Sequence, residues 1–161
     1  MKFMFTILLF ISVLYPQTPQ EEWWAAATSS QRATIRNVYE RNKVYNKAFT
    51  LAAFSIVESS GGIHLLNVSE ASGGYYAQKA FHVAQRVYTA DSPTPWQVSR
   101  VLQKLITDRD FDDFHARANI DELLDRYGGR WMMVWKWWNS HRPGQAEEVR
   151  AWVRFLHKQF K

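Results

Sequence analysis

The amino-acid sequence predicts a mainly α-helical domain, and three observations support this. Apolar residues recur at intervals of three and four along most of the chain. No segment alternates apolar and polar residues for long enough to predict a half-buried β-strand. Thr18-Pro19-Gln20-Glu21 and Thr94-Pro95-Trp96-Gln97 each place a proline at the first helical position after a capping threonine. With 161 residues, the chain is long enough for one domain with its own hydrophobic core.

The N-terminal segment predicts export. One cation, Lys2, precedes an apolar run from Phe3 to Leu14, which has the length of a signal-peptide core and is short for a membrane span. No small-residue cleavage site follows this run directly, so the alternative is a tether that keeps the protein at the membrane. We therefore divide the chain into a signal peptide or N-terminal membrane anchor, residues 1–20, and a folded domain, residues 21–161. The predicted location is the periplasm or cell envelope.

Composition excludes several kinds of site. The chain has no cysteine, which rules out a disulfide framework and a thiolate metal site. The five histidines show no helical ligand spacing, so we predict no metal and no cofactor. The formal net charge of +5 is too small and too evenly scattered to indicate a nucleic-acid partner. Neither a Gly-x-Ser-x-Gly nucleophile motif nor a glycine-rich phosphate loop is present. We expect a monomer.

Apolar spacing and stop signals divide the domain into successive helices. The expected helices are a short one through Trp23 and Trp24, one from Thr28 that leads into a buried segment at Phe49–Val57, one after Tyr75, one capped by Thr94, one capped by Asn119, one from Trp131, and a last one through Val149 and Phe160. The segment between Gly61 and Gly74 has no helical or strand period, and we expect a functional loop there.

An acidic run precedes one of these helices: Asp108, Asp110, Asp112 and Asp113. Such a run suggests a calcium loop, but the glycine and the terminal glutamate of a calcium-binding loop are missing. The sequence therefore favours a solvated helix start.

One carboxylate, Glu58, stands at the end of a helix that we expect to be buried on all sides. From Phe49 to Val57 only Thr50 and Ser55 are polar, and Gly61–Gly62 then end the helix. Desolvation and the negative end of the helix dipole both disfavour a charged carboxylate, so we expect a raised pKa, which suits a proton donor. The alternative is a solvated glutamate just beyond the buried turns.

A second apolar helix, from Trp131 to Trp138, also ends in one polar residue, Asn139. Core packing explains most of its tryptophans. A proton donor and a hydrogen-bonding amide on either side of a cleft would nevertheless suit attack on a polar polymer. Glu58 and Asn139 are therefore candidate site residues.

The order of these motifs resembles that of lysozyme-like lytic transglycosylases of the soluble type and their phage relatives. The resemblance rests on Glu58-Ser59-Ser60-Gly61-Gly62, a loop with Ser69-Glu70-Ala71, Gly74-Tyr75-Tyr76-Ala77-Gln78, and Trp138-Asn139, and it covers residues 51–160. It implies a lysozyme-like fold and cleavage of peptidoglycan glycan strands between N-acetylmuramic acid and N-acetylglucosamine.

The resemblance also implies roles for single residues. Glu58 matches the catalytic acid/base, and Ser59 its neighbour that holds it or the substrate. Asn139 matches the amide that contacts the sugar, with Trp138 in place of the usual tyrosine. The chain departs from the family pattern at two points: Gln78 lies one residue later than usual, so Tyr75 or Tyr76 is the alternative lining of the cleft, and Ser140-His141 replace a glycine.

The number of carboxylates separates two reactions. A hydrolytic muramidase of the phage type is expected to carry its second carboxylate about nine residues after the first. Asn67 occupies that position, and Glu70 is the nearest acid, expected to face solvent. The sequence therefore favours a transglycosylase with one acid/base, which forms a 1,6-anhydro product. The alternatives are a hydrolytic muramidase or phage endolysin, and a non-catalytic glycan-binding module of the cell envelope.

Overall fold

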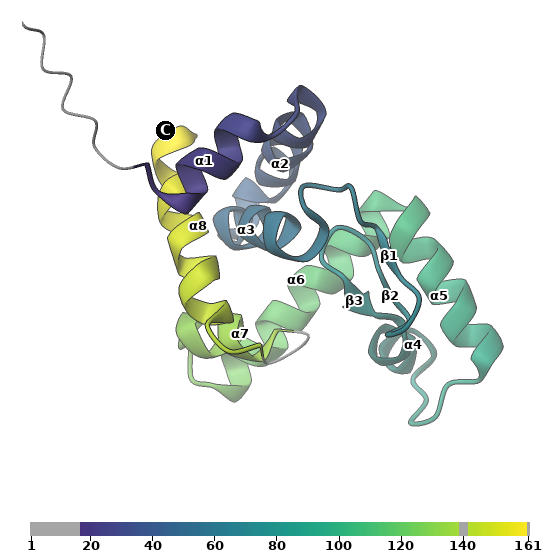
Figure 1. The fold of residues 1–161 in the computed structure, drawn as a ribbon. Coiled ribbons are helices and arrows are strands. Elements are labelled where there is room, and N and C mark those ends of the chain that lie inside the picture. The colour runs from purple at the N-terminus through teal and green to yellow at the C-terminus, as the bar shows by residue number, and fades with distance from the viewer. Residues whose placement is uncertain (1–16, 139–141, 161) are drawn as a thin grey trace, which may run out of the picture.

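The computed structural model describes residues 17–138 and 142–160 of the chain. Within these residues it contains eight α-helices and three two-residue strands, which confirms the prediction of a mainly α protein (Figure 1). Most of the predicted leader and Asn139 lie outside the described residues. No helix in the described part of the chain combines the length and apolar character that crossing a membrane requires.

The elements follow one another with short connections. Their bounds are α1 Pro19–Ala26, α2 Ser29–Asn42, a 3-10 helix Lys43–Tyr45, α3 Ala48–Ser59, β1 Leu66–Asn67, β2 Ser72–Gly73, β3 Gln78–Lys79, α4 Ala80–Tyr88, α5 Pro95–Thr107, α6 Arg109–Arg126, α7 Trp131–Trp137 and α8 Gln145–Gln159.

The predicted helix starts are confirmed where the sequence carries a capping box. The side chains of Thr18, Thr28 and Thr94 each accept a hydrogen bond from the backbone N–H three residues on. The side chain of that later residue in turn accepts a hydrogen bond from the backbone N–H of the threonine. The predicted end of α3 is also confirmed, because Ser60 and Gly61 take left-handed conformations with φ of 52° and 69°.

Two predicted boundaries are wrong. Asn119 does not start a helix, because α6 runs unbroken from Arg109 to Arg126. Ala116 and Ile120 are both buried around that position, so core packing prevails over the capping tendency of asparagine. In addition, α2 does not run into α3, since Asn46 is left-handed with φ 54° and turns the chain between them.

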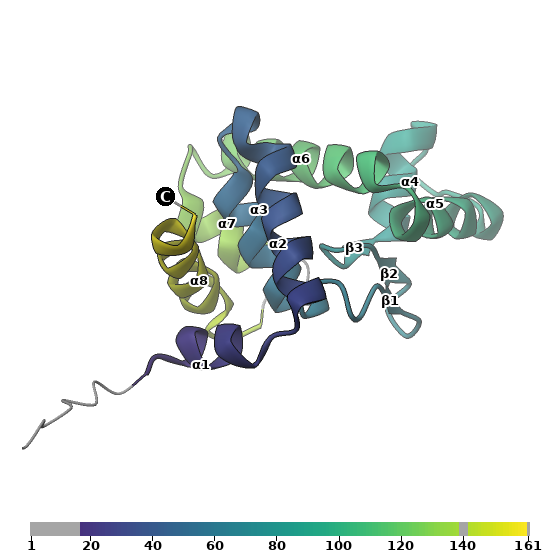
Figure 2. The same cartoon turned by 90° about the horizontal axis from the view of Figure 1, so that it is seen from above.

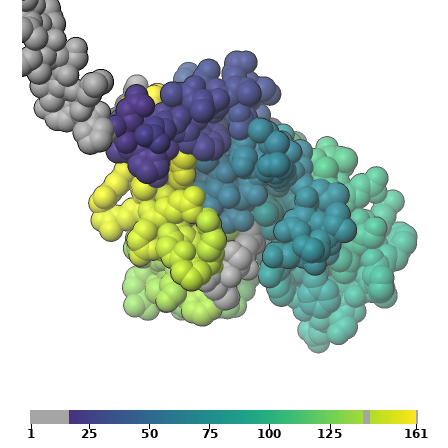
Figure 3. Space-filling view, viewed as in Figure 1, coloured from purple at the N-terminus to yellow at the C-terminus, as the bar shows by residue number. Residues whose placement is uncertain are grey.

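Two lobes flank a central helix. The large lobe consists of α1, α2, α3, α7 and α8, and the small lobe of the three strands with α4 and α5. Helix α6 extends from one lobe to the other (Figure 2). In the space-filling view the purple and yellow residues of the large lobe and the teal residues of the small lobe form separate parts of the surface (Figure 3).

Each lobe has its own apolar core. The large-lobe core gathers side chains from α2, α3, α6, α7 and α8, and at its centre Phe54 stacks on Trp138 with ring centroids 4.3 Å apart. The small-lobe core holds only five buried residues, all from α4 and α5: Ala80, Val83, Ala84, Val101 and Leu105. The large lobe therefore buries most of the apolar surface that stabilises the protein.

The three strands form an antiparallel sheet in the order β1-β2-β3, which sequence reasoning did not predict. Gly73 pairs with Leu66 on one side and with Gln78 on the other. A Cβ atom at Gly73 would lie 2.9 Å from Leu102 on α5, so the absence of a side chain lets the sheet lie directly on that helix.

Candidate active site

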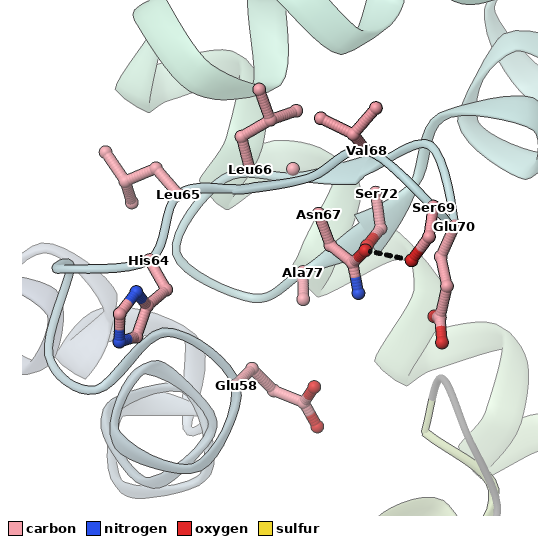
Figure 4. Close-up of a pocket in the computed structure, with 11 residues that line it drawn as sticks. Glu58, His64, Leu65, Leu66, Asn67, Val68, Ser69, Glu70, Ser72 and Ala77 are labelled. Atoms are coloured by element: carbon pink, nitrogen blue, oxygen red, sulfur yellow. Dashed lines mark hydrogen bonds between the residues drawn. The ribbon is translucent and has the colours of Figure 1, made fainter.

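Glu58 lies where the two lobes meet. It occupies the last turn of α3, after seven consecutive buried residues (50–56) and the half-buried Val57, and is itself half-buried. It lines a cavity of about 610 Å³ whose remaining lining comes from residues 64–77. Figure 4 shows the Glu58 carboxylate on the α3 side, directed toward the space below the loop. The buried helix thus ends by presenting one carboxylate to a cavity.

Gln145 holds the Glu58 carboxylate. This residue starts α8 and is 1% exposed. Its Nε2 donates to Oε1 of Glu58 at 3.1 Å and to the carbonyl oxygen of Trp138, also at 3.1 Å. The amide therefore links the ends of three large-lobe helices and fixes the direction of the acid.

The opposite wall carries further polar side chains, among them Asn67 and Glu70. Asn67 and Glu70 are exposed residues of the loop and line the same cavity. Ser69 Oγ donates to Asn67 Oδ1 at 2.7 Å, which leaves the Asn67 amide nitrogen directed into the cavity (Figure 4). Glu70 extends toward the same space from the far end of the loop. A polar ligand in the cavity would meet an acid from one lobe and an amide and an acid from the other.

Asp112, near the start of α6, supports this wall from beneath. Its Oδ2 accepts from the Tyr75 backbone N–H at 2.8 Å, and its Oδ1 accepts from Gln78 Nε2 at 2.7 Å. Gly74 lies against the carboxylate with φ of 82°, and a Cβ atom there would be 2.4 Å from Oδ1. The path of residues 74–78 is therefore set by one buried side chain.

Asp113 completes a buried acidic pair. Its Oδ1 accepts from the Tyr76 hydroxyl at 2.5 Å, and its Oδ2 accepts from Arg41 Nε at 2.7 Å. Arg109 Nε lies 3.5 Å from Oδ1. Burial raises the pKa of Tyr76 well above its ordinary value, and the adjacent carboxylates raise it further. Tyr76 therefore remains a hydroxyl donor.

The two aspartates do not form the solvated helix start that the sequence favours; that expectation is wrong. Asp112 and Asp113 are 0% and 1% exposed. Burial raises the pKa of Asp112 to about 7, although the hydrogen bonds from Gln78 and Tyr75 oppose this. Asp108 does behave as expected, since it caps α6 at the Phe111 N–H.

The structure places most predicted substrate-binding residues inside the protein. Ser59 is buried, and its hydroxyl donates to Ser55 O and accepts from the Gly62 N–H. Gln78 is 2% exposed, and Tyr76 and Trp138 are fully buried. Direct contact of these four side chains with a ligand is therefore not supported, because each is already committed to interior contacts.

Tyr75 is the predicted aromatic residue that remains partly exposed. The Arg109 guanidinium lies over its ring at 3.3 Å from the centroid, a cation–π contact that holds the ring on α6. Among the predicted residues in the described part of the chain, only Glu58 lines the cavity. Asn139 lies outside the described residues, so its predicted role stays a prediction.

Sequence reasoning missed the residues that position the site. Asp112 and Asp113 share the helical spacing of Ala116, Ile120 and Leu123, and that buried stripe is the signal that predicts their burial. Gln145 gives no comparable signal, because a glutamine at a helix start is ordinary on an exposed surface.

No family model, curated protein or solved structure that we compared matches the chain. The functional interpretation therefore rests on the chemistry of the cavity. No cluster of His, Asp and Glu within the described residues is suited to hold a metal ion. The groups assembled at the cavity are a held carboxylate, an amide and a second, exposed carboxylate, which together can donate and accept protons on a polar ligand.

Proposed function

We propose that this protein is a peptidoglycan lytic transglycosylase of lysozyme-like type and that Glu58 is its acid/base. The observation that carries the proposal is the position of Glu58, half-buried at the end of the buried helix α3, on the wall of a cavity and held by Gln145. A carboxyl group in such a place suits general acid catalysis, since its environment is partly dry and its direction is fixed.

The proposed reaction uses one carboxyl group twice. Glu58 gives its proton to the oxygen that joins N-acetylmuramic acid to N-acetylglucosamine, and the bond from the muramyl C1 to that oxygen breaks. The Glu58 carboxylate then accepts the proton of the muramyl C6 hydroxyl while O6 bonds to C1. The acid is regenerated, and the products are a free N-acetylglucosamine end and a 1,6-anhydromuramyl end. Water takes no part.

The remaining parts of the proposal follow from the substrate. The partner is a peptidoglycan glycan strand, and the apolar run at residues 3–14 is proposed as an export signal or membrane tether that places the enzyme in the periplasm or cell envelope. We propose that the enzyme acts as a monomer and needs no metal or cofactor, because a lone carboxyl group suffices for this chemistry.

Glu70 favours a second candidate, a hydrolytic muramidase of the kind found in phage endolysins. Its side chain extends toward the cavity that Glu58 lines (Figure 4). Two carboxylates flanking a cleaved bond are what glycoside hydrolysis ordinarily uses. Against this, Glu70 is an exposed residue of the loop, whereas Glu58 is held by a buried amide.

The first test compares Glu58→Gln with the wild type in a gel that contains purified cell walls. We expect the variant to clear no zone, because an amide cannot donate the proton at neutral pH. Glu147→Gln, an exposed glutamate in the first turn of α8, is the matched control and should clear like wild type. If Glu58→Gln clears the gel as well as the wild type, Glu58 is not the catalytic acid. If the wild type binds cell walls but does not clear them, the protein is instead a glycan-binding module.

The second test measures the mass of the released muropeptides. A transglycosylase releases anhydro ends, each lighter by one water than the reducing ends that a hydrolase releases. We expect anhydro products from the wild type and also from Glu70→Gln. Reducing ends that disappear in Glu70→Gln would favour the muramidase instead.

A further inference from the structure

A second cavity, of about 650 Å³, lies between the small lobe and the helices α6 and α7. It is lined by β3, α4, α6 and the end of α7, and its chemically distinctive residues are Lys79, His82, Arg86, Glu122, Arg126 and Trp137. None of these residues belongs to the lining of the cavity at Glu58.

On both walls, residues that are adjacent in sequence lie near the two cavities. On the small-lobe wall, Ala77 lines the Glu58 cavity and Gln78 lines the second one. On the large-lobe wall, Trp137 lines the second cavity, and the carbonyl of the next residue, Trp138, shares the Gln145 amide with Glu58. The two cavities therefore border on consecutive residues at the start of β3 and at the end of α7.

The second cavity is positively charged. Its lining has three cations, Lys79, Arg86 and Arg126, against one carboxylate, that of Glu122. Glu122 is paired with Arg126 at 2.9 Å, and Arg86 gives one N–H to the His115 carbonyl at 3.1 Å. Lys79 makes no ion pair with any residue in the described part of the chain. The excess positive charge indicates an anionic ligand.

We propose that this cavity binds the carboxylate groups of the peptide that branches from each muramyl residue of the glycan strand. The inference rests on the proposed function, because it extends the substrate from the glycan to its peptide substituent. Arginine and lysine at one site recognise carboxylates through charge-assisted hydrogen bonds. The ring of Trp137 and the amides of Gln85 and Asn119, all in the lining, supply contacts for a peptide chain.

The test measures binding to two soluble ligands that differ only in the peptide. One is a glycan fragment that carries its peptides, and the other is the same fragment after an amidase has removed them. The Glu58→Gln protein, which should bind without cleaving, is compared with the same protein carrying Lys79→Ala and Arg126→Ala. Lys79 makes no ion pair within the described residues, and the exposed Arg126–Glu122 pair contributes little to folding, so the variant should remain folded.

We expect the double substitution to weaken binding of the peptide-bearing fragment about tenfold, as the loss of charge-assisted bonds predicts, and to leave binding of the bare fragment unchanged. Arg154→Ala with Lys158→Ala, exposed positions on α8, removes the same charge and should change neither affinity. Equal affinities of the parent for the two fragments would overturn the inference, as would equal weakening by the α8 control.

This outcome is distinguishable from failure of the proposed function. If the wild type releases no fragments from cell walls, the transglycosylase proposal fails, but the binding comparison still has its own result. If the wild type cleaves walls and the double variant binds both fragments like its parent, the proposed function stands and the peptide site is overturned.

Discussion

On the large-lobe wall of the candidate active-site cavity, Glu58 projects from a helix whose preceding turns are buried among apolar side chains. The small-lobe wall is instead a sheet of two-residue strands supported by buried aspartates. The first wall depends on packing and the second on hydrogen bonds. Packing tolerates changes of pH, while hydrogen bonds to carboxylates do not. Substitutions in the apolar core should therefore destabilise the large-lobe wall, and changes of pH should destabilise the small-lobe wall.

The largest effect is expected from Phe54→Ala in the large lobe. Phe54 is fully buried and stacks on Trp138, so its loss leaves a cavity beneath the Glu58 wall. We expect the free energy of unfolding to fall by about 3–5 kcal/mol, measured by urea denaturation. Phe114→Ala, at a side chain that is 59% exposed, is the control and should change it by less than about 0.5 kcal/mol. Similar losses at both positions would contradict the importance of this core.

Asp112→Asn tests the pH dependence of the other wall. The folded-state pKa of Asp112 is raised from 3.8 to about 7 by burial, so the folded protein holds this proton more tightly than the unfolded chain. The stability that the proton provides is fully present below pH 3.8 and is lost as the pH rises through about 7. Asparagine does not titrate in this range.

Relative to Asp112→Asn, the wild type should therefore lose free energy of unfolding as the pH rises over that interval, by about 1.4 kcal/mol for each unit of pKa difference. Urea denaturation of both proteins at several pH values measures this difference, and the comparison cancels the titration of other groups. A difference that is constant with pH, or that grows in favour of the wild type, would contradict the prediction.

Tyr76→Phe tests the hydrogen bond to the second aspartate. The substitution removes the hydroxyl that donates to Asp113 and leaves that buried carboxylate with its arginine partners. We expect a loss of about 1–3 kcal/mol, because a buried acceptor loses a donor without gaining water. Tyr88→Phe, on α4, has no side-chain hydrogen bond to a described residue and should change stability little. Equal stability of Tyr76→Phe and the wild type would show that the bond makes no net contribution.

The smallest effect is expected from Gln145→Ala, and it concerns activity on the proposed substrate. Without the amide, the Glu58 carboxyl group loses one of the contacts that direct it. We expect kcat to fall about tenfold with little change in KM, which corresponds to about 1.4 kcal/mol in the barrier. Steady-state kinetics on soluble glycan fragments measures both constants. A rise in KM at constant kcat would instead place Gln145 in substrate binding.

Much of the large lobe was predictable from the sequence, because short-range sequence patterns predict its helices. The capping box at Thr18, the helix start at Thr28 and the apolar residues before Glu58 depend on neighbours within one or two turns. The position of Glu58 at the end of a buried helix was predictable for the same reason. Its partner Gln145 was not, since 87 residues separate the two in sequence and only the folded chain brings them together.

The small-lobe wall was largely unpredictable. Strands of two residues are too short to show an alternating pattern, so residues 64–77 give no periodic signal. The charges of Asp112 and Asp113 predict exposure to solvent, but their position on the helix predicts burial. Their spacing to Ala116 and Ile120 carries the information that they face inward. Charge alone is therefore a weaker guide to burial than the register of a helix.

The double hydrogen bond of Gln145 has a chemical consequence. The carbonyl of Trp138 can only accept, so the Gln145 atom that faces it must be the NH₂ group, and the other hydrogen of that group points to Oε1 of Glu58. Oε1 is thereby fixed as an acceptor. A single glutamine at the start of the last helix thereby orients the carboxyl group that we propose as the acid.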